Sequence, residues 1–199
     1  MRAPLGALGF VRRSMKCWKC KEKVEGPVCV SCSTIQPPPQ KPDYFALFGI
    51  EPGYFIGDLG KTYRKRSRQL HPDRFINKSA VERRMSLLWM AALNEAKRCL
   101  EDPITRARYI ATGSAQIRED KKIVLDPEFL ERIFSLQMEA MTDPQGVRQQ
   151  AQKEHAHLFA ELESLFRSWQ EDRKETHLLR VEPLLARLKY INNLINIKE

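Results

Sequence analysis

The chain lacks any long apolar run, and it is poor in glycine. Its longest uninterrupted apolar stretch, Leu87 to Leu93, is seven residues, whereas a helix that crosses a bilayer needs roughly 20. Nine glycines in 199 residues that are rich in Leu, Glu, Lys, Arg and Ala argue against collagen and low-complexity structure and favour helices. We therefore expect an all-α protein of one to two domains, with no membrane partner.

Motifs of common enzymes are also missing. The sequence has no glycine-rich phosphate loop, no paired catalytic carboxylates in a recognisable frame and no Ser/His/Asp signature. His155 and His157 are two residues apart, so on a helix they do not face each other and make a poor metal pair. We predict no catalytic activity.

Acidic residues are absent from the first 21 positions, which hold six of the 34 basic residues. The remainder carries 28 basic against 25 acidic residues. Most of the net charge of +9 therefore comes from the N-terminal segment, and the rest of the chain is only weakly basic. We therefore expect no nucleic-acid partner, with a zinc-containing nucleic-acid binder as the lesser alternative.

The opening segment, residues 1–15, is basic and apolar, and it resembles the remnant of an organelle transit peptide. It predicts a location in the mitochondrial matrix, with the cytoplasm also open. An unstructured basic N-terminus explains the same composition equally well.

Four of the five cysteines form two C-x-x-C pairs within residues 16–34, with Gly26-Pro27 as a turn between them. Two such pairs can deliver four thiolates in tetrahedral geometry, which favours structural Zn²⁺, with iron second. Disulfides would need an oxidising compartment, and redox pairs would want a β-α-β setting that this stretch lacks. The predicted ligands are Cys17, Cys20, Cys29 and Cys32, and Cys99 is predicted to be a core thiol.

A proline-rich linker, residues 35–42, follows the cysteines and should run as a stiff extended spacer. Beyond it, Asp-Pro pairs begin at Asp102, Asp126 and Asp143, and Asp43 stands before an aromatic run. An Asp that caps the first turn, with Pro at the first helical position, is a helix start.

Two helices are predicted on either side of His71-Pro72-Asp73, as an antiparallel hairpin within residues 43–112. The first runs from Asp58 to Leu70 and has a narrow seam of Leu59, Tyr63, Ser67 and Leu70. The second is expected to face it with Val81, Met85, Leu88, Ala92, Ala96 and Leu100.

The first of these two helices also has a basic face at helical spacing, which consists of Lys61, Arg64, Lys65 and Arg68. This face suits an acidic protein patch, and the corner offers donors and acceptors to a partner. A solvated basic helix that ends in an ordinary proline turn is the alternative.

Residues 113–125 show no period and are expected to be a connecting loop, and residues 126–199 form a helical bundle of three helices. The first bundle helix has two apolar stripes. One contains Phe129, Ile133, Leu136 and Ala140, and the other contains Leu130, Phe134, Met138 and Met141. Because a three-helix bundle buries only one side of a helix, the second stripe is either a docking surface or the completion of the core.

The motif His71-Pro72-Asp73 between two helices, after Tyr44-Phe45-Ala46-Leu47-Phe48, resembles a J domain, the module that stimulates DnaK-class chaperones. The lack of a Gly/Phe-rich segment, together with Asp102-Pro103-Ile104-Thr105-Arg106 and Asp126-Pro127-Glu128-Phe129-Leu130, narrows the resemblance to the HscB class of iron-sulfur co-chaperones. The four-cysteine leader is similar to the animal-type branch of that class. One departure is Lys97, where the family usually has tyrosine, and it puts local packing in doubt.

This resemblance implies an architecture and partners. The expected parts are a J-domain hairpin, a C-terminal three-helix bundle and a small zinc module. The hairpin would contact a DnaK-class chaperone through His71, Pro72, Asp73 and the basic face and promote its ATP hydrolysis. The bundle would hold the iron-sulfur scaffold protein through Leu130, Phe134 and Tyr190. A general J-domain co-chaperone with other clients is the main alternative, and a homo-oligomer stays open.

Overall fold

The computed structural model describes residues 15–116, 123 and 125–197. The chain divides into two compact units, one up to Arg106 and one from Ala107 onward. No helix in the described ranges is both long and apolar enough to cross a membrane. The predicted transit segment lies outside the described residues except for Met15.

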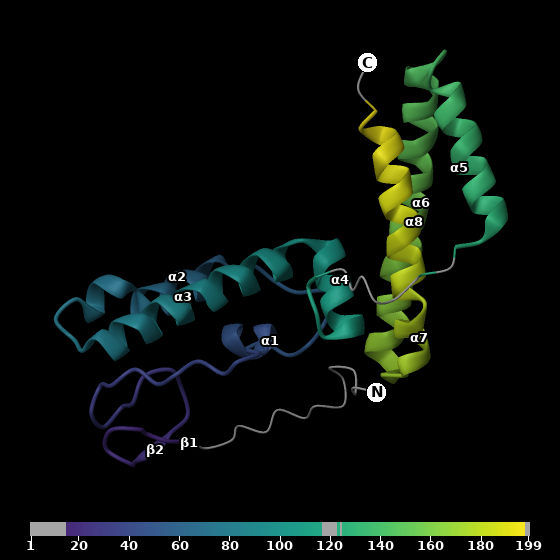
Figure 1. The fold of residues 1–199 in the computed structure, drawn as a ribbon. Coiled ribbons are helices and arrows are strands. Elements are labelled where there is room, and N and C mark those ends of the chain that lie inside the picture. Colours follow the sequence, from purple (N-terminus) through teal and green to yellow (C-terminus); the bar gives the residue numbers. More distant parts are fainter. Residues whose placement is uncertain (1–14, 117–122, 124, 198–199) are drawn as a thin grey trace. The chain divides into compact units, whose positions relative to one another are not determined.

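The first unit begins with a small module around the four cysteines (Figure 1). Strand β1 (Met15–Lys16) pairs antiparallel with β2 (Lys23–Val24), and an isolated bridge joins Val28 to Ile35. These short strands were not predicted. They leave the fold class all-α, because helices make up every other regular element of the described chain.

The hairpin forms as predicted. Helix α1 (Tyr44–Phe48) is capped by Asp43, whose carboxylate accepts from the N–H groups of Phe45 and Ala46. Helix α2 (Gly60–Leu70) leads through the 3₁₀ turn η2 (Pro72–Phe75) into α3 (Ala80–Glu101), which packs beside it (Figure 1). A reciprocal capping box between Ser79 and Glu82 starts α3.

The predicted contact face of α3 is confirmed at Ala96 and Leu100, which are buried, and is wrong at Val81 and Leu88. Val81 is 54% exposed and Leu88 is 49% exposed, whereas the buried positions are Glu82, Ser86, Trp89, Leu93, Ala96, Cys99 and Leu100. Two buried polar groups explain the difference. Ser86 donates to the carbonyl of Leu70 at 2.6 Å, and Glu82 belongs to the capping box. Because hydrogen bonds satisfy these groups, they can occupy the core face that a count of apolar residues gives to their neighbours.

Three of the remaining helices begin at the predicted Asp-Pro pairs. Helix α4 (Pro103–Thr112) spans the boundary of the two units, and α5 (Pro127–Glu139) and α6 (Pro144–Asp172) follow. The carboxylates of Asp102, Asp126 and Asp143 each accept a backbone N–H two or three residues later. Between α4 and α5, residues 113–116, 123, 125 and 126 are not helical, which fits the expected loop, and the rest of it lies outside the described residues.

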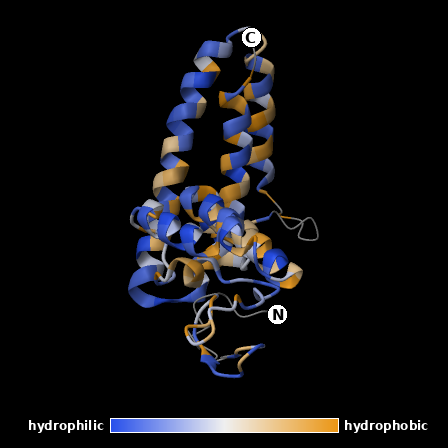
Figure 2. Cartoon of the chain, turned by 90° about the vertical axis from the view of Figure 1, so that its left-hand side faces the viewer, coloured by the Kyte–Doolittle hydropathy of each residue, from blue (hydrophilic) through white to orange (hydrophobic). Residues whose placement is uncertain are grey.

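The second unit packs α6 against α8 (Val181–Ile195), with α5 against both. The buried residues of α6 are Val147, Ala151, Leu158, Leu162, Leu165, Phe166 and Trp169, and those of α8 include Leu184, Leu185, Leu188, Ile191 and Leu194. Figure 2 shows hydrophobic and hydrophilic residues interspersed along these helices. A further short helix, α7 (Glu175–Leu179), was not predicted, and Pro183 lies in the first turn of α8, where proline is tolerated.

Candidate functional site

The four predicted metal ligands lie together. Their sulfur atoms are all within 4.8 Å of one another, and the Cys17–Cys32 and Cys20–Cys29 sulfur pairs are each 3.6 Å apart. Sulfurs at tetrahedral positions about 2.3 Å from a zinc ion are about 3.8 Å apart, whereas those of a disulfide are about 2.05 Å apart. The donor set therefore fits a closed four-thiolate metal site and not two disulfides.

Each cysteine pair is bent by the same backbone turn. The N–H of Lys21 donates to the carbonyl of Cys17 at 3.0 Å, and the N–H of Ser33 donates to that of Cys29 at 2.9 Å. Lys21 and Ser33 both adopt positive φ, +66° and +55°, so the chain reverses at the same point after each pair. This repeated turn aims both pairs at one point.

The sulfurs differ in their readiness to ionise. Burial opposes ionisation of Cys17, but backbone N–H groups at Cys20 and Lys19 favour its thiolate and bring its pKa down to about 6. The backbone at Glu22 favours the thiolate of Cys20, yet burial and the neighbouring sulfurs together raise its pKa to about 12. Four thiolates this close repel one another, and a bound cation would offset that repulsion.

Gln36 links this site to the hairpin. Its side-chain N–H groups donate to Cys17 Sγ at 3.3 Å and to the backbone carbonyl of Thr34 at 2.8 Å. The backbone carbonyl of Gln36 accepts from the indole N–H of Trp89 on α3 at 2.7 Å. Sequence reasoning assigned Gln36 to the spacer, but the residue is only 2% exposed, and no sequence signal pairs it with a tryptophan 53 positions away.

The predicted corner, His71-Pro72-Asp73, forms the tip of the hairpin and projects into solvent. The side chains of His71 and Asp73 are 48% and 76% exposed. His71 Nδ1 accepts from the backbone N–H of Asp73 at 3.3 Å, which leaves Nε2 as the outward donor in this tautomer. Pro72 occupies the first position of η2, where its ring fixes the backbone. The corner thus presents a donor and a carboxylate side by side.

Buried groups hold this corner rigid. Phe75, two residues after the tip, is 4% exposed, and Ser86 binds the last carbonyl of α2. Farther along, Tyr63 Oη donates to Asn94 Oδ1 at 2.8 Å. Lys97, the departure from the family pattern, lies 5.4 Å over the Tyr63 ring and pairs with Glu101 at 2.6 Å, so the hairpin packs around it.

The basic face of α2 is confirmed as a surface. Lys61, Arg64, Lys65 and Arg68 are all exposed, and none has an ion-pair partner within the described part of the chain. They follow one another at helical spacing on the helix that ends at the tip.

The two stripes of α5 separate as expected. Phe129, Ile133, Leu136 and Ala140 are buried, whereas Leu130, Phe134, Met138 and Met141 are 40%, 64%, 55% and 78% exposed. Tyr190 of α8 is 39% exposed, and its ring meets Phe129 edge-on, with 6.3 Å between ring centroids. Tyr190 therefore packs against the buried stripe of α5 at Phe129 while staying partly exposed.

Comparison with known proteins identifies the family. No protein-family profile matches the chain. An iron-sulfur cluster co-chaperone protein HscB homolog of Arabidopsis thaliana is 37% identical over 122 residues, which cover 60% of this chain and 48% of the relative. A co-chaperone protein HscB homolog of Bordetella petrii is 32% identical over 137 residues, 67% of this chain and 75% of the relative.

Solved structures share the fold. The human co-chaperone protein HscB superposes with a TM-score of 0.73 over 89% of this chain and 93% of that one, at 19% identity. The chaperone HscB of Vibrio cholerae gives a TM-score of 0.60 over 77% of this chain and 93% of the solved chain. Because the Bordetella petrii relative is 32% identical over three quarters of its length, the chain belongs to the HscB family of co-chaperone proteins.

Proposed function

We propose that this chain is a co-chaperone of iron-sulfur cluster biogenesis, which delivers a cluster scaffold protein to a DnaK-class chaperone in the mitochondrial matrix. The chain spans about half the length of the Arabidopsis relative whose name refers to iron-sulfur clusters. The observation that carries the proposal is the exposed His71-Pro72-Asp73 corner on a rigid hairpin.

The hairpin acts on the chaperone. Cations on the basic face of α2 attract an acidic surface and fix the orientation of the encounter. His71 and Asp73 then hydrogen bond to chaperone groups that must rearrange before ATP is hydrolysed. The chaperone performs the chemistry, and this chain supplies no catalytic group.

The second unit holds the cargo protein. Leu130, Phe134 and Tyr190 offer exposed apolar surface on packed helices, which can bind a folded partner with modest affinity suited to transfer. The cluster travels on the scaffold and is not a cofactor of this chain. The four cysteines hold a structural metal, because a closed four-sulfur site leaves no position open for chemistry. Zn²⁺ is the preferred ion, and iron is the second choice.

ATP hydrolysis by a purified mitochondrial DnaK-class chaperone tests the proposal. The wild-type chain should stimulate single-turnover hydrolysis, more weakly at high salt. His71→Gln should abolish stimulation with unchanged helical content. His157→Gln, which alters an exposed histidine of α6, is the matched control and should act as wild type. An active His71→Gln variant would overturn the proposal.

A further inference from the structure

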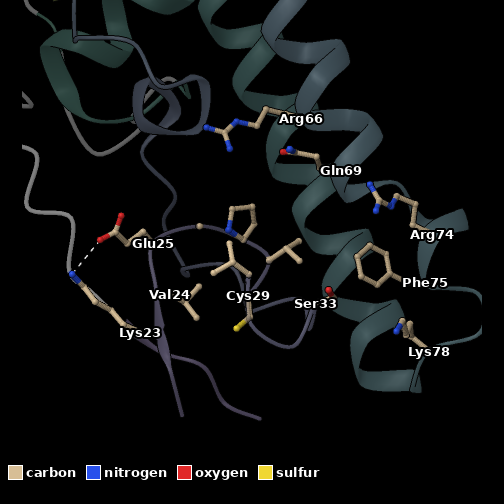
Figure 3. Close-up of a pocket in the computed structure, with 14 residues that line it drawn as sticks. Lys23, Val24, Glu25, Cys29, Ser33, Arg66, Gln69, Arg74, Phe75 and Lys78 are labelled. Carbon is tan, nitrogen blue, oxygen red and sulfur yellow. Dashed lines mark ion pairs between the residues drawn. The ribbon is translucent and has the colours of Figure 1, made fainter. Parts of the chain in front are cut away.

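A cleft of about 790 Å³ separates the four-cysteine module from the tip of the hairpin (Figure 3). One wall is formed by the module, from Lys23 to Ser33. The other wall is formed by Arg66 and Gln69 of α2, Arg74 and Phe75 of η2, and Lys78. Neither the basic face nor the tip includes these residues, so the cleft is a separate feature.

The cleft is strongly cationic. Four of its lining residues are basic, Lys23, Arg66, Arg74 and Lys78, and Glu25 is the one acidic residue among them. Glu25 pairs with Lys23 at 3.1 Å. Arg66, Arg74 and Lys78 have no carboxylate partner in the described ranges, which leaves three positive charges along one wall. A concave surface between low-dielectric walls concentrates such a field on a bound anion.

The lining also has apolar parts. Val24 and Phe75 are buried, and Pro27 and Val28 are partly buried. A small anion would use only the cations and leave most of this volume unused. An extended peptide that carries acidic side chains among apolar ones matches both kinds of lining.

Both walls are fixed before a ligand arrives. The hydrogen bond from Trp89 to Gln36 holds the module against α3, and Cys29, one of the four clustered cysteines, lines the cleft itself. Phe75 is anchored in the hairpin core. A preformed cleft avoids much of the ordering cost of binding.

We propose that this cleft binds an acidic, extended segment of the same DnaK-class chaperone that the tip contacts. The inference rests on the proposed function, because Arg74 and Phe75 directly follow Asp73 and a chaperone engaged at the tip lies at the edge of the cleft. The four-cysteine module is thereby a second wall of the chaperone interface.

The first experiment tests the cleft without the chaperone. The probe is a fluorescein-labelled peptide of alternating Glu and Leu, measured by anisotropy with the metal-loaded full-length chain. The wild type should bind it and lose roughly tenfold or more of its affinity at high salt. The double variant Arg66→Glu/Lys78→Glu should lose binding to a similar extent. The matched control Arg84→Glu/Lys153→Glu reverses two exposed charges that lie outside both the cleft and the basic face, and it should bind as wild type.

Three results would overturn the cleft assignment. These are equal binding by the Arg66→Glu/Lys78→Glu variant, equal binding of a peptide with Lys in place of Glu, and tighter binding of inorganic polyphosphate than of the peptide. Melting curves establish that the variants fold. The milder Arg66→Gln/Lys78→Gln pair repeats the measurement if charge reversal lowers stability.

The second experiment assigns the segment to the chaperone. In the ATPase assay, Arg66→Glu/Lys78→Glu should raise the concentration of this chain needed for half-maximal stimulation and leave the maximal stimulation unchanged. His71→Gln should instead abolish stimulation at every concentration. An unchanged half-maximal concentration overturns the chaperone as occupant while the proposed function stands. If the wild type itself stimulates no hydrolysis, the proposed function fails, and the peptide titration still decides whether the cleft binds acidic peptides.

Discussion

The indole N–H of Trp89 donates to the backbone carbonyl of Gln36 at 2.7 Å, in a site where the two residues are 7% and 2% exposed. The same Gln36 contacts Cys17 Sγ through its side-chain amide. One residue thus touches both a cysteine of the four-cysteine cluster and the longest helix of the hairpin. The cysteine module and the J-domain hairpin are therefore a single packed structure joined at Gln36.

The Trp89→Phe variant tests this junction. It keeps an aromatic ring but leaves the Gln36 carbonyl buried without its donor, so the free energy of unfolding should fall by about 1–3 kcal/mol. Urea denaturation followed by circular dichroism measures the change. Trp18→Phe is the control, because Trp18 also donates to a backbone carbonyl, that of Ile35 at 2.8 Å, but is 40% exposed and water can replace it. Equal losses in both variants would contradict the junction.

Metal removal should unfold the module and loosen the hairpin. Structural zinc in small peptides contributes about 10–16 kcal/mol of apparent binding free energy at neutral pH. We expect one metal ion per chain by elemental analysis, and a chelator should lower the melting temperature and expose four thiols to a thiol reagent. Cys17→Ser should lose the metal, whereas Cys99→Ser, which alters the buried thiol of α3 outside the cluster, should keep it. A metal-free wild type after anaerobic purification would contradict the assignment.

Local chemistry explains what was predictable from the sequence. An Asp that caps a helix bonds to a backbone N–H two or three residues away, so the starts of α4, α5 and α6 follow from their Asp-Pro pairs alone. The basic face of α2 and the exposed stripe of α5 also depend only on helical spacing. Each cysteine pair likewise carries its own turn.

Distant partners explain what was not predictable. The face of α3 that packs inward is decided by Ser86 on the Leu70 carbonyl and Trp89 on the Gln36 carbonyl, and neither polar pairing appears in the periodicity of α3. The cationic cleft depends on the same docking, because its walls come from segments about 40 residues apart. Helix α7 is a single short element whose boundary depends on Asp172, a residue of the preceding helix.

The corner between α6 and α7 should be acid-sensitive. Asp172 accepts from the backbone N–H of Lys174 at 2.9 Å and lies 3.1 Å from His177 Nε2. These contacts lower the pKa of Asp172 from 3.8 to about 2. Since the folded state favours the ionised carboxylate, its stabilising effect is complete above about pH 4 and is lost as the pH falls towards about 2.

Thermal melts between pH 5 and pH 2 measure this contribution. Asp172→Asn should lower the melting temperature at pH 5 and reduce its further fall towards pH 2. Glu175→Gln, which removes an exposed carboxylate three residues away, should leave the acid profile as in wild type. An acid profile of Asp172→Asn that parallels wild type would contradict the role of this carboxylate.

The exposed stripe of α5 and Tyr190 should carry the affinity for the scaffold protein. Apolar side chains at the centre of an interface commonly account for most of its binding free energy, and truncating one costs about 1–2 kcal/mol or more. The triple variant Leu130→Ala/Phe134→Ala/Tyr190→Ala should therefore weaken binding at least roughly tenfold in calorimetric titration with the scaffold. It should change the melting temperature little, because all three side chains are at least 39% exposed. Leu179→Ala is the matched control, since Leu179 of α7 is 75% exposed and lies outside the stripe. Full affinity in the triple variant would mean that the stripe does not hold the scaffold, and a loss in Leu179→Ala alone would move the docking surface to α7.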